Sequence, residues 1–159
     1  MLERDQISPE LAALYDVLLA QRGVVPNMFK TVANHPNLAL TFAAFLKSLL
    51  SDGALPGWYK ELIAARIASE QQIVAMKSDF ERGPFTEAEK LGLRCADRLH
   101  HSANQIDDDF YAKLQSVYND QQIIELIATA SAFQFFPRFV DALRIPLTPL
   151  PEKISAGQV

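Results

Sequence analysis

Apolar residues recur at spacings of three and four along almost the whole chain, and no run of alternating β-branched residues stands out. Spacings of three and four place side chains on one face of an α-helix, whereas a half-buried strand needs strict alternation. Turn-forming residues separate the periodic segments, for example at Gly23, at 52–57 and at Gly83. The sequence therefore predicts an all-α bundle of about six helices.

Several helix ends carry recognisable signals. Ser8 followed by Pro9 predicts the start of the first helix, and Gly23 predicts its end. Residues 24–30 are predicted as a loop. Residues 86–89, with the sequence TEAE, match a capping box, in which a threonine hydroxyl and a glutamate carboxylate each satisfy a free amide.

The last predicted helix, 121–143, is apolar on nearly every face, so we expect it to lie centrally or in a subunit interface. Pro146, Pro149 and Pro151 exclude helix beyond it. The expected organisation is a single helical domain over 1–146 and an extended or disordered tail over 147–159.

The composition limits the classes of partner. The chain has 159 residues and a formal net charge of −4, with acidic and basic residues mixed along its length, so no basic stripe is available for nucleic acid. Polar residues interrupt the most apolar stretch, which falls short of the ~20 residues of a membrane span. The N-terminus lacks the pattern of an export signal, and Cys95 is the one cysteine. We therefore expect a cytoplasmic protein that binds neither nucleic acid nor membrane.

Three stretches of the chain form a recognisable pattern. Residues 25–30, VPNMFK, precede His35 and Pro36; residues 55–63 read LPGWYKELI; and residues 135–143 read FFPRFVDAL. Each resembles a motif of the carboxymuconolactone decarboxylase / alkylhydroperoxidase D-like (AhpD-like) family, and their order and spacing span most of the chain. The resemblance implies an AhpD-like helical fold, a homo-oligomer (dimer, trimer or hexamer) and a small-molecule ligand or substrate.

The resemblance breaks at the thiol pair of the family's peroxidases. Counting from Glu61 without gaps places Ile73 and Met76 at the two cysteine positions and Phe80 at the histidine position. An alignment with a shorter gap places Glu70, Ile73 and Lys77 at the two cysteine positions and the histidine position. It recovers no thiol either. Peroxide reduction needs one thiolate to attack and a second thiol to resolve the sulfenic acid. The sequence therefore argues against thiol peroxidase activity.

Glu61 is the one catalytic side chain of the family that the chain keeps. It can be a carboxylate in an apolar pocket, with a raised pKa, that acts as general acid or base. Alternatively it is a first-turn glutamate favoured by the helix dipole, or an ion-pair partner of Arg66 or Arg138.

Other residues could line a small-molecule pocket. Ile73, Met76 and Phe80 could form its apolar wall or could be ordinary core, and the candidate polar groups are His35, Gln72 and Gln134. His35 can equally be a helix cap. Cys95 is predicted to be a buried core residue, and His100 and His101 to end a helix without binding a metal.

Two functions remain open at the level of sequence. The first is a lyase or isomerase without cofactor or metal, in which Glu61 moves a proton on a small organic acid or lactone. The second is a non-catalytic relative that binds a small hydrophobic molecule or serves as an oligomeric scaffold. An antioxidant alkylhydroperoxidase would follow from family membership alone.

Overall fold

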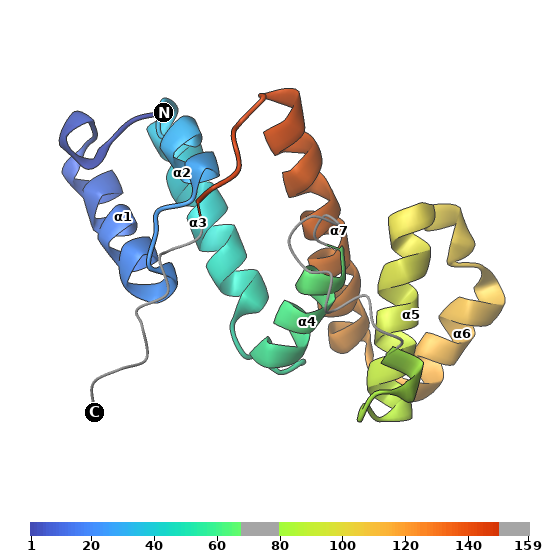
Figure 1. Ribbon diagram of the computed structural model, residues 1–159. Helices are drawn as coiled ribbons and strands as arrows, with labels where there is room; N and C mark the ends of the chain where they lie inside the picture. The colour runs from blue at the N-terminus through green and yellow to red at the C-terminus, as the bar shows by residue number, and fades with distance from the viewer. Residues whose placement is uncertain (68–79, 150–159) are drawn as a thin grey trace. The chain divides into compact units, whose positions relative to one another are not determined.

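The computed structural model describes residues 1–67 and 80–149, and all regular structure in these two ranges is helical (Figure 1). Its α-helices are α1 (Pro9–Arg22), α2 (Asn27–Val32), α3 (Pro36–Leu50), α4 (Gly57–Ile67), α5 (Glu87–His101), α6 (Asp108–Val117) and α7 (Asp120–Ala142). Short 3-10 helices are η1 (Arg4–Gln6), η3 (Phe80–Arg82) and η4 (Ala103–Gln105). The all-α prediction is confirmed. The expected loop over 24–30 was partly wrong, because α2 begins at Asn27. This helix has six residues, too few for a periodic pattern of apolar residues to reveal it.

The chain packs as two compact units. Unit 1 comprises Met1–Leu46 and Val140–Val159, and unit 2 comprises Lys47–Phe139. The unit boundaries fall within α3 and within α7. The expected single domain over 1–146 stays a prediction.

In unit 1, α1 has the ends that the sequence predicted. The Ser8 hydroxyl accepts a hydrogen bond from the Leu11 amide, and Gly23 ends the helix in the left-handed conformation (φ 69°) while donating to the Leu19 carbonyl. The described part of the C-terminal segment is not helical, as its prolines require. Asn27 holds this segment: its backbone amide donates to the Thr148 hydroxyl, and its side-chain nitrogen donates to the carbonyls of Pro146 and Leu147.

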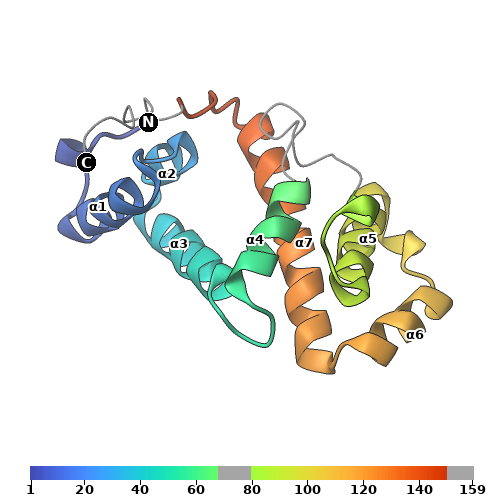
Figure 2. The ribbon, with the colours of Figure 1, turned by 60° about the horizontal axis from the view of Figure 1, so that its bottom comes forward.

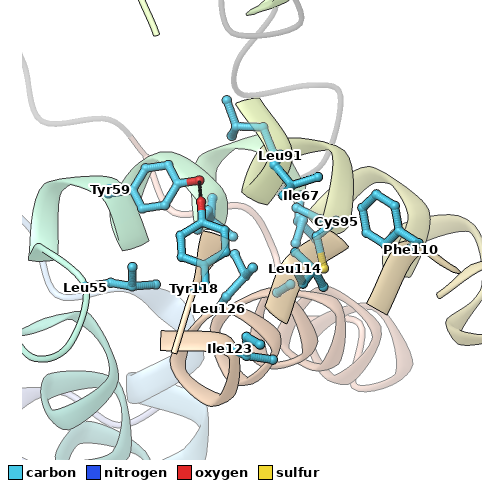
Figure 3. Close-up of a cluster of buried hydrophobic side chains, with 14 residues drawn as sticks. Leu55, Tyr59, Ile67, Leu91, Cys95, Phe110, Leu114, Tyr118, Ile123 and Leu126 are labelled. Carbon is cyan, nitrogen blue, oxygen red and sulfur yellow. Dashed lines mark hydrogen bonds between the residues drawn. The ribbon is translucent and has the colours of Figure 1, made fainter. Parts of the chain in front are cut away.

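Unit 2 has a continuous apolar core that the helices α4 to α7 build together. α4 lies against α7, and α5 lies beside α6, in both ribbon views (Figures 1 and 2). Figure 3 shows the core, to which α4 contributes Tyr59 and Ile67, α5 Leu91 and Cys95, and α6 Leu114. The capping box at Thr86 and Glu89 is confirmed, and Asp107 caps α6 through the Phe110 amide.

The long helix α7 is buried on one side only. It buries Ile123, Leu126 and Ala130 in the core of unit 2, but it exposes 67% of Ile124 and 47% of Phe135. Among the described residues, α7 is the one helix long and apolar enough to cross a membrane. This is weak evidence for a membrane span, because the core helix of a soluble protein passes the same test.

Two buried tyrosines fix the distance between α4 and α5. The Tyr59 hydroxyl donates to the Glu89 carbonyl and the Tyr118 hydroxyl to the Ala88 carbonyl, and the two hydroxyl oxygens lie 3.2 Å apart (Figure 3). Gly92 leaves the space they occupy: a Cβ atom there would stand 2.1 Å from the Tyr59 hydroxyl oxygen. Glycine is therefore required in the middle of α5.

A second buried polar cluster joins the loop before α4 to α7. The Lys60 side chain is 1% exposed, and its Nζ lies 3.1 Å from Oε2 of Glu125. The same carboxylate accepts hydrogen bonds from the amides of Ala54 (3.0 Å) and Leu55 (2.9 Å). Burial alone would raise the pKa of Glu125, but these amides and the Lys60 ammonium hold the pKa below its usual value. We call these four residues the Glu125 clasp.

We expect Gly92→Ala to lower the free energy of unfolding by about 1 to 3 kcal/mol, because the new methyl group must displace the Tyr59 hydroxyl. An ordinary helix position would instead gain stability from the same change. Urea unfolding measures both, and Tyr59→Phe in the same chain should restore part of the loss. A Gly92→Ala protein as stable as wild type would contradict the close contact.

We expect Glu125→Gln to lower the free energy of unfolding by about 2 to 3 kcal/mol at pH 7, because the buried Lys60 ammonium loses its counter-charge. The lowered pKa means that the carboxylate contributes fully above the ordinary glutamate pKa of 4.5, and that this contribution fades as the pH falls through the folded-state pKa. Urea unfolding between pH 3 and 7 should show a weaker acid dependence in Glu125→Gln. Adding Lys60→Met should recover stability, and equal acid dependence in both proteins would contradict the assignment.

Candidate functional site

Glu61 lies on the outer face of α4. Tyr59, Ile63 and Ile67 define the inner face because all three belong to the core of unit 2. Successive helix residues are separated by about 100°, so Glu61 lies on the opposite side, where it is exposed. The residues that the structure describes do not enclose the Glu61 carboxylate, and the role of Glu61 as a site residue stays a prediction.

Glu61 has no ion-pair partner within the described ranges. Arg66, one of the two expected partners, binds both carboxylate oxygens of Asp97 at 2.8 and 2.9 Å. Arg138, the other expected partner, forms no ion pair with Glu61 or with any other described carboxylate. The ion-pair interpretation of Glu61 is thus wrong for both arginines, and its carboxylate is left open to solvent.

The neighbouring charged residue has the opposite environment. Lys60 points inward and is held by the Glu125 clasp, while Glu61 points outward. The sequence interpretation missed Lys60 and Glu125. A usable signal was present, because a glutamate among the apolar residues Ile123, Ile124 and Leu126 indicates a partner for its charge.

Phe80 and His35, two of the predicted pocket residues, belong to different units. Phe80 starts η3, packs against the core of unit 2, and lies under the Arg66 guanidinium, whose carbon is 4.8 Å from the ring centroid. His35 belongs to unit 1, where its exposed ring accepts a hydrogen bond from the Leu38 amide at 3.3 Å. The cap interpretation of His35 is confirmed. The other predicted pocket residues, Ile73, Met76 and Gln72, lie outside the described residues.

Gln134 is a partly buried residue of α7 whose side-chain nitrogen is buried without a hydrogen-bond partner. It is the one such side-chain atom in the described ranges. Thr129, a fully buried polar residue of the same helix, is paired, because its hydroxyl donates to the Glu125 carbonyl at 2.7 Å. Gln134 therefore remains a candidate for binding a polar ligand group.

The thiol of Cys95 is fully buried in the core of unit 2 (Figure 3). Burial raises the pKa of the thiol to about 11, and the nearby Arg98 guanidinium opposes this only in part. The core interpretation of Cys95 is confirmed. His101 donates from Nδ1 to the Asp97 carbonyl in the last turn of α5, and the described residues contain no group of three or more potential metal ligands.

No protein-family model matches the sequence, and no curated protein matches it either. Solved structures do match. An uncharacterised peroxidase-related protein with an AhpD core from Ralstonia eutropha JMP134 has 15% identity and a TM-score of 0.76, covering 92% of this chain and 89% of that one. A peroxidase-related protein from Silicibacter sp. TM1040 has 18% identity and a TM-score of 0.78, covering 92% and 90%. The debrominase Bmp8 has 21% identity and a TM-score of 0.77, covering 94% and 91%. The chain therefore has the fold of the AhpD-like proteins.

Proposed function

We propose that the protein is a lyase or isomerase that acts on a small organic acid or lactone without using a cysteine, with Glu61 as the group that moves the proton. The observation that carries this proposal is the state of Glu61, an exposed carboxylate with no ion pair or hydrogen bond to another described residue. A carboxylate engaged by a cation loses basicity, whereas an unengaged one can accept a proton from a bound substrate.

The proposed chemistry needs only one carboxylate. Glu61 removes a proton from the carbon next to a carbonyl or carboxyl group, and the electron pair of the broken C–H bond moves onto the carbonyl oxygen. Return of the proton at another carbon gives an isomer. In a decarboxylation the C–C bond breaks, carbon dioxide leaves and the electron pair stays on carbon. That carbon then takes a proton from the carboxylic acid form of Glu61, which water protonates again. Neither sequence requires a metal or a cofactor.

Thiol chemistry is not part of the proposal, although the fold is shared with proteins described as peroxidase-related. With a pKa of about 11, roughly one Cys95 thiol in 10⁴ is ionised at neutral pH. The chain has no second cysteine that could resolve a sulfenic acid. Debromination belongs to the neighbour Bmp8 and is not transferred to this chain.

The second candidate is a non-catalytic protein that self-associates in the cytoplasm and binds a small hydrophobic molecule. The apolar side chains that unit 2 exposes favour it, namely Trp58 on α4 and both Ile124 and Phe135 on α7. A dimer, trimer or hexamer would cover such residues. Sedimentation velocity tests this candidate, because a monomer at micromolar concentration would contradict the scaffold role.

We expect Glu61→Gln to abolish proton transfer, because an amide cannot accept the proton. The measurement is NMR of deuterium incorporation at carbon during incubation of small carboxylic acids and lactones with the protein in D₂O. Loss of a general base should lower the exchange rate by about 10² to 10⁴. Glu10→Gln, an exposed first-turn glutamate in α1, is the matched control and should exchange at the wild-type rate. Absence of exchange with every compound, or full activity of Glu61→Gln, would contradict the proposal.

We expect Cys95 to resist modification by a thiol reagent at pH 8 in the native protein and to react fully in 6 M guanidinium chloride. Burial limits access, and the raised pKa leaves little thiolate. Absorbance of the released chromophore measures the reaction, and Cys95→Ser supplies the blank. Rapid labelling of the native protein would show that the thiol is available, and peroxide turnover lost in Cys95→Ser would overturn the thiol-independent assignment.

A further inference from the structure

The C-terminal half of α7 holds two hydrogen-bond donors without acceptors. The first is the side-chain nitrogen of Gln134, which is buried and unpaired. Leaving an amide donor unpaired in a protein interior destabilises the fold by about 1 to 3 kcal/mol, so such groups are usually matched by a ligand, a water molecule or another side chain.

The second donor is the guanidinium of Arg138, which is exposed. Two other arginines of unit 2 have carboxylate partners: Arg66 binds Asp97, and Arg94 binds Glu81. Arg138 forms no ion pair or hydrogen bond with any residue of the described ranges, which sets it apart from them. Its planar array of N–H groups is suited to binding both oxygens of a carboxylate.

The two donors lie on the same face of one helix. Residues four apart in an α-helix have side chains about 5 to 6 Å apart at Cβ, so Gln134 and Arg138 can contact a single group. We propose that Gln134 and Arg138 form a carboxylate-binding site on α7, with Arg138 at its exposed rim and Gln134 at its inner end. Gln134 as a whole is only partly buried, so rotation about its terminal torsions can turn the amide toward a ligand.

The surroundings favour a carboxylate with a compact apolar body. The side-chain nitrogens of Gln134 and Arg138 can donate hydrogen bonds but cannot accept them. The ligand group that pairs with them is therefore a carboxylate or carbonyl oxygen. Phe135 and Phe139 stack beside Arg138 on the same helix, with centroids 5.6 Å apart, and Phe135 is exposed. A small aromatic acid combines both features. The inference deepens the proposed function, on which its substrate class rests, by naming residues that would recognise the acid group.

The test uses benzoate as the probe and benzamide as its neutral counterpart. Isothermal titration on the full chain gives the dissociation constants, and ¹⁵N NMR follows the side-chain amide of Gln134. We expect benzoate to shift this amide resonance and to bind at least tenfold more tightly than benzamide. Gln134→Leu and Arg138→Met should each weaken benzoate binding about tenfold to a hundredfold, and Arg138→Lys should retain part of it. Gln134→Glu, which keeps the side-chain shape, should abolish binding by charge repulsion.

The matched controls are Gln121→Leu, which removes an exposed amide from the same helix, and Lys113→Met, which removes an exposed charge from unit 2. Both should bind benzoate as wild type does. No benzoate binding at 10 mM, or unchanged affinity in Gln134→Leu and Arg138→Met, would overturn the site. Benzoate binding without any proton exchange would reject the proposed reaction and support the site. Proton exchange together with unchanged benzoate affinity in Gln134→Leu and Arg138→Met would support the reaction and reject the site.

Discussion

The structure of unit 2 depends on one carboxylate, that of Glu125. A buried lysine is tolerated only where a counter-charge and hydrogen bonds replace water, and Glu125 supplies the counter-charge to Lys60 while it binds two backbone amides of the preceding loop. The loop, the first turn of α4 and the second turn of α7 are thereby fixed to one another. Tyr59 and Ile63 of the same helix are buried in the core of unit 2, and Glu61, halfway between them in sequence, lies on the opposite, exposed side of α4.

This arrangement determines which chemistry the chain can offer. The cysteine is enclosed by apolar side chains that keep it protonated, whereas a carboxylate and a guanidinium are accessible on α4 and α7. Proteins with this fold include ones described as peroxidase-related and a debrominase, so the fold alone does not select a reaction. The accessible groups suit proton transfer and anion binding, and for that reason we favour a substrate with an acidic group.

The helix ends could be predicted from the sequence because their signals are local. Ser8, Gly23 and Thr86 each act on amides or carbonyls within four residues, so their roles can be recognised without tertiary structure. The environment of Glu61 could not be predicted in the same way. Which face of α4 is buried depends on the packing of Tyr59 and Ile63 in the core, and the counter-charge of Lys60 comes from Glu125, 65 residues away in the sequence. The missing acceptors of Gln134 and Arg138 are likewise a property of the packed chain and leave no mark on the sequence.

The contacts of Asn27 affect the order in which the two units can fold while the chain is being synthesised. Unit 2 is continuous in sequence, so it can fold as soon as residues 47–139 have emerged. Unit 1 combines both ends of the chain, and the hydrogen bond from Asn27 to Thr148 joins residues separated by 121 positions. Closing so long a loop is slow, and its C-terminal side is made last. The N-terminal helices, although translated first, must therefore wait for nearly the whole chain before unit 1 is complete, and during this time they are exposed to chaperones and proteases.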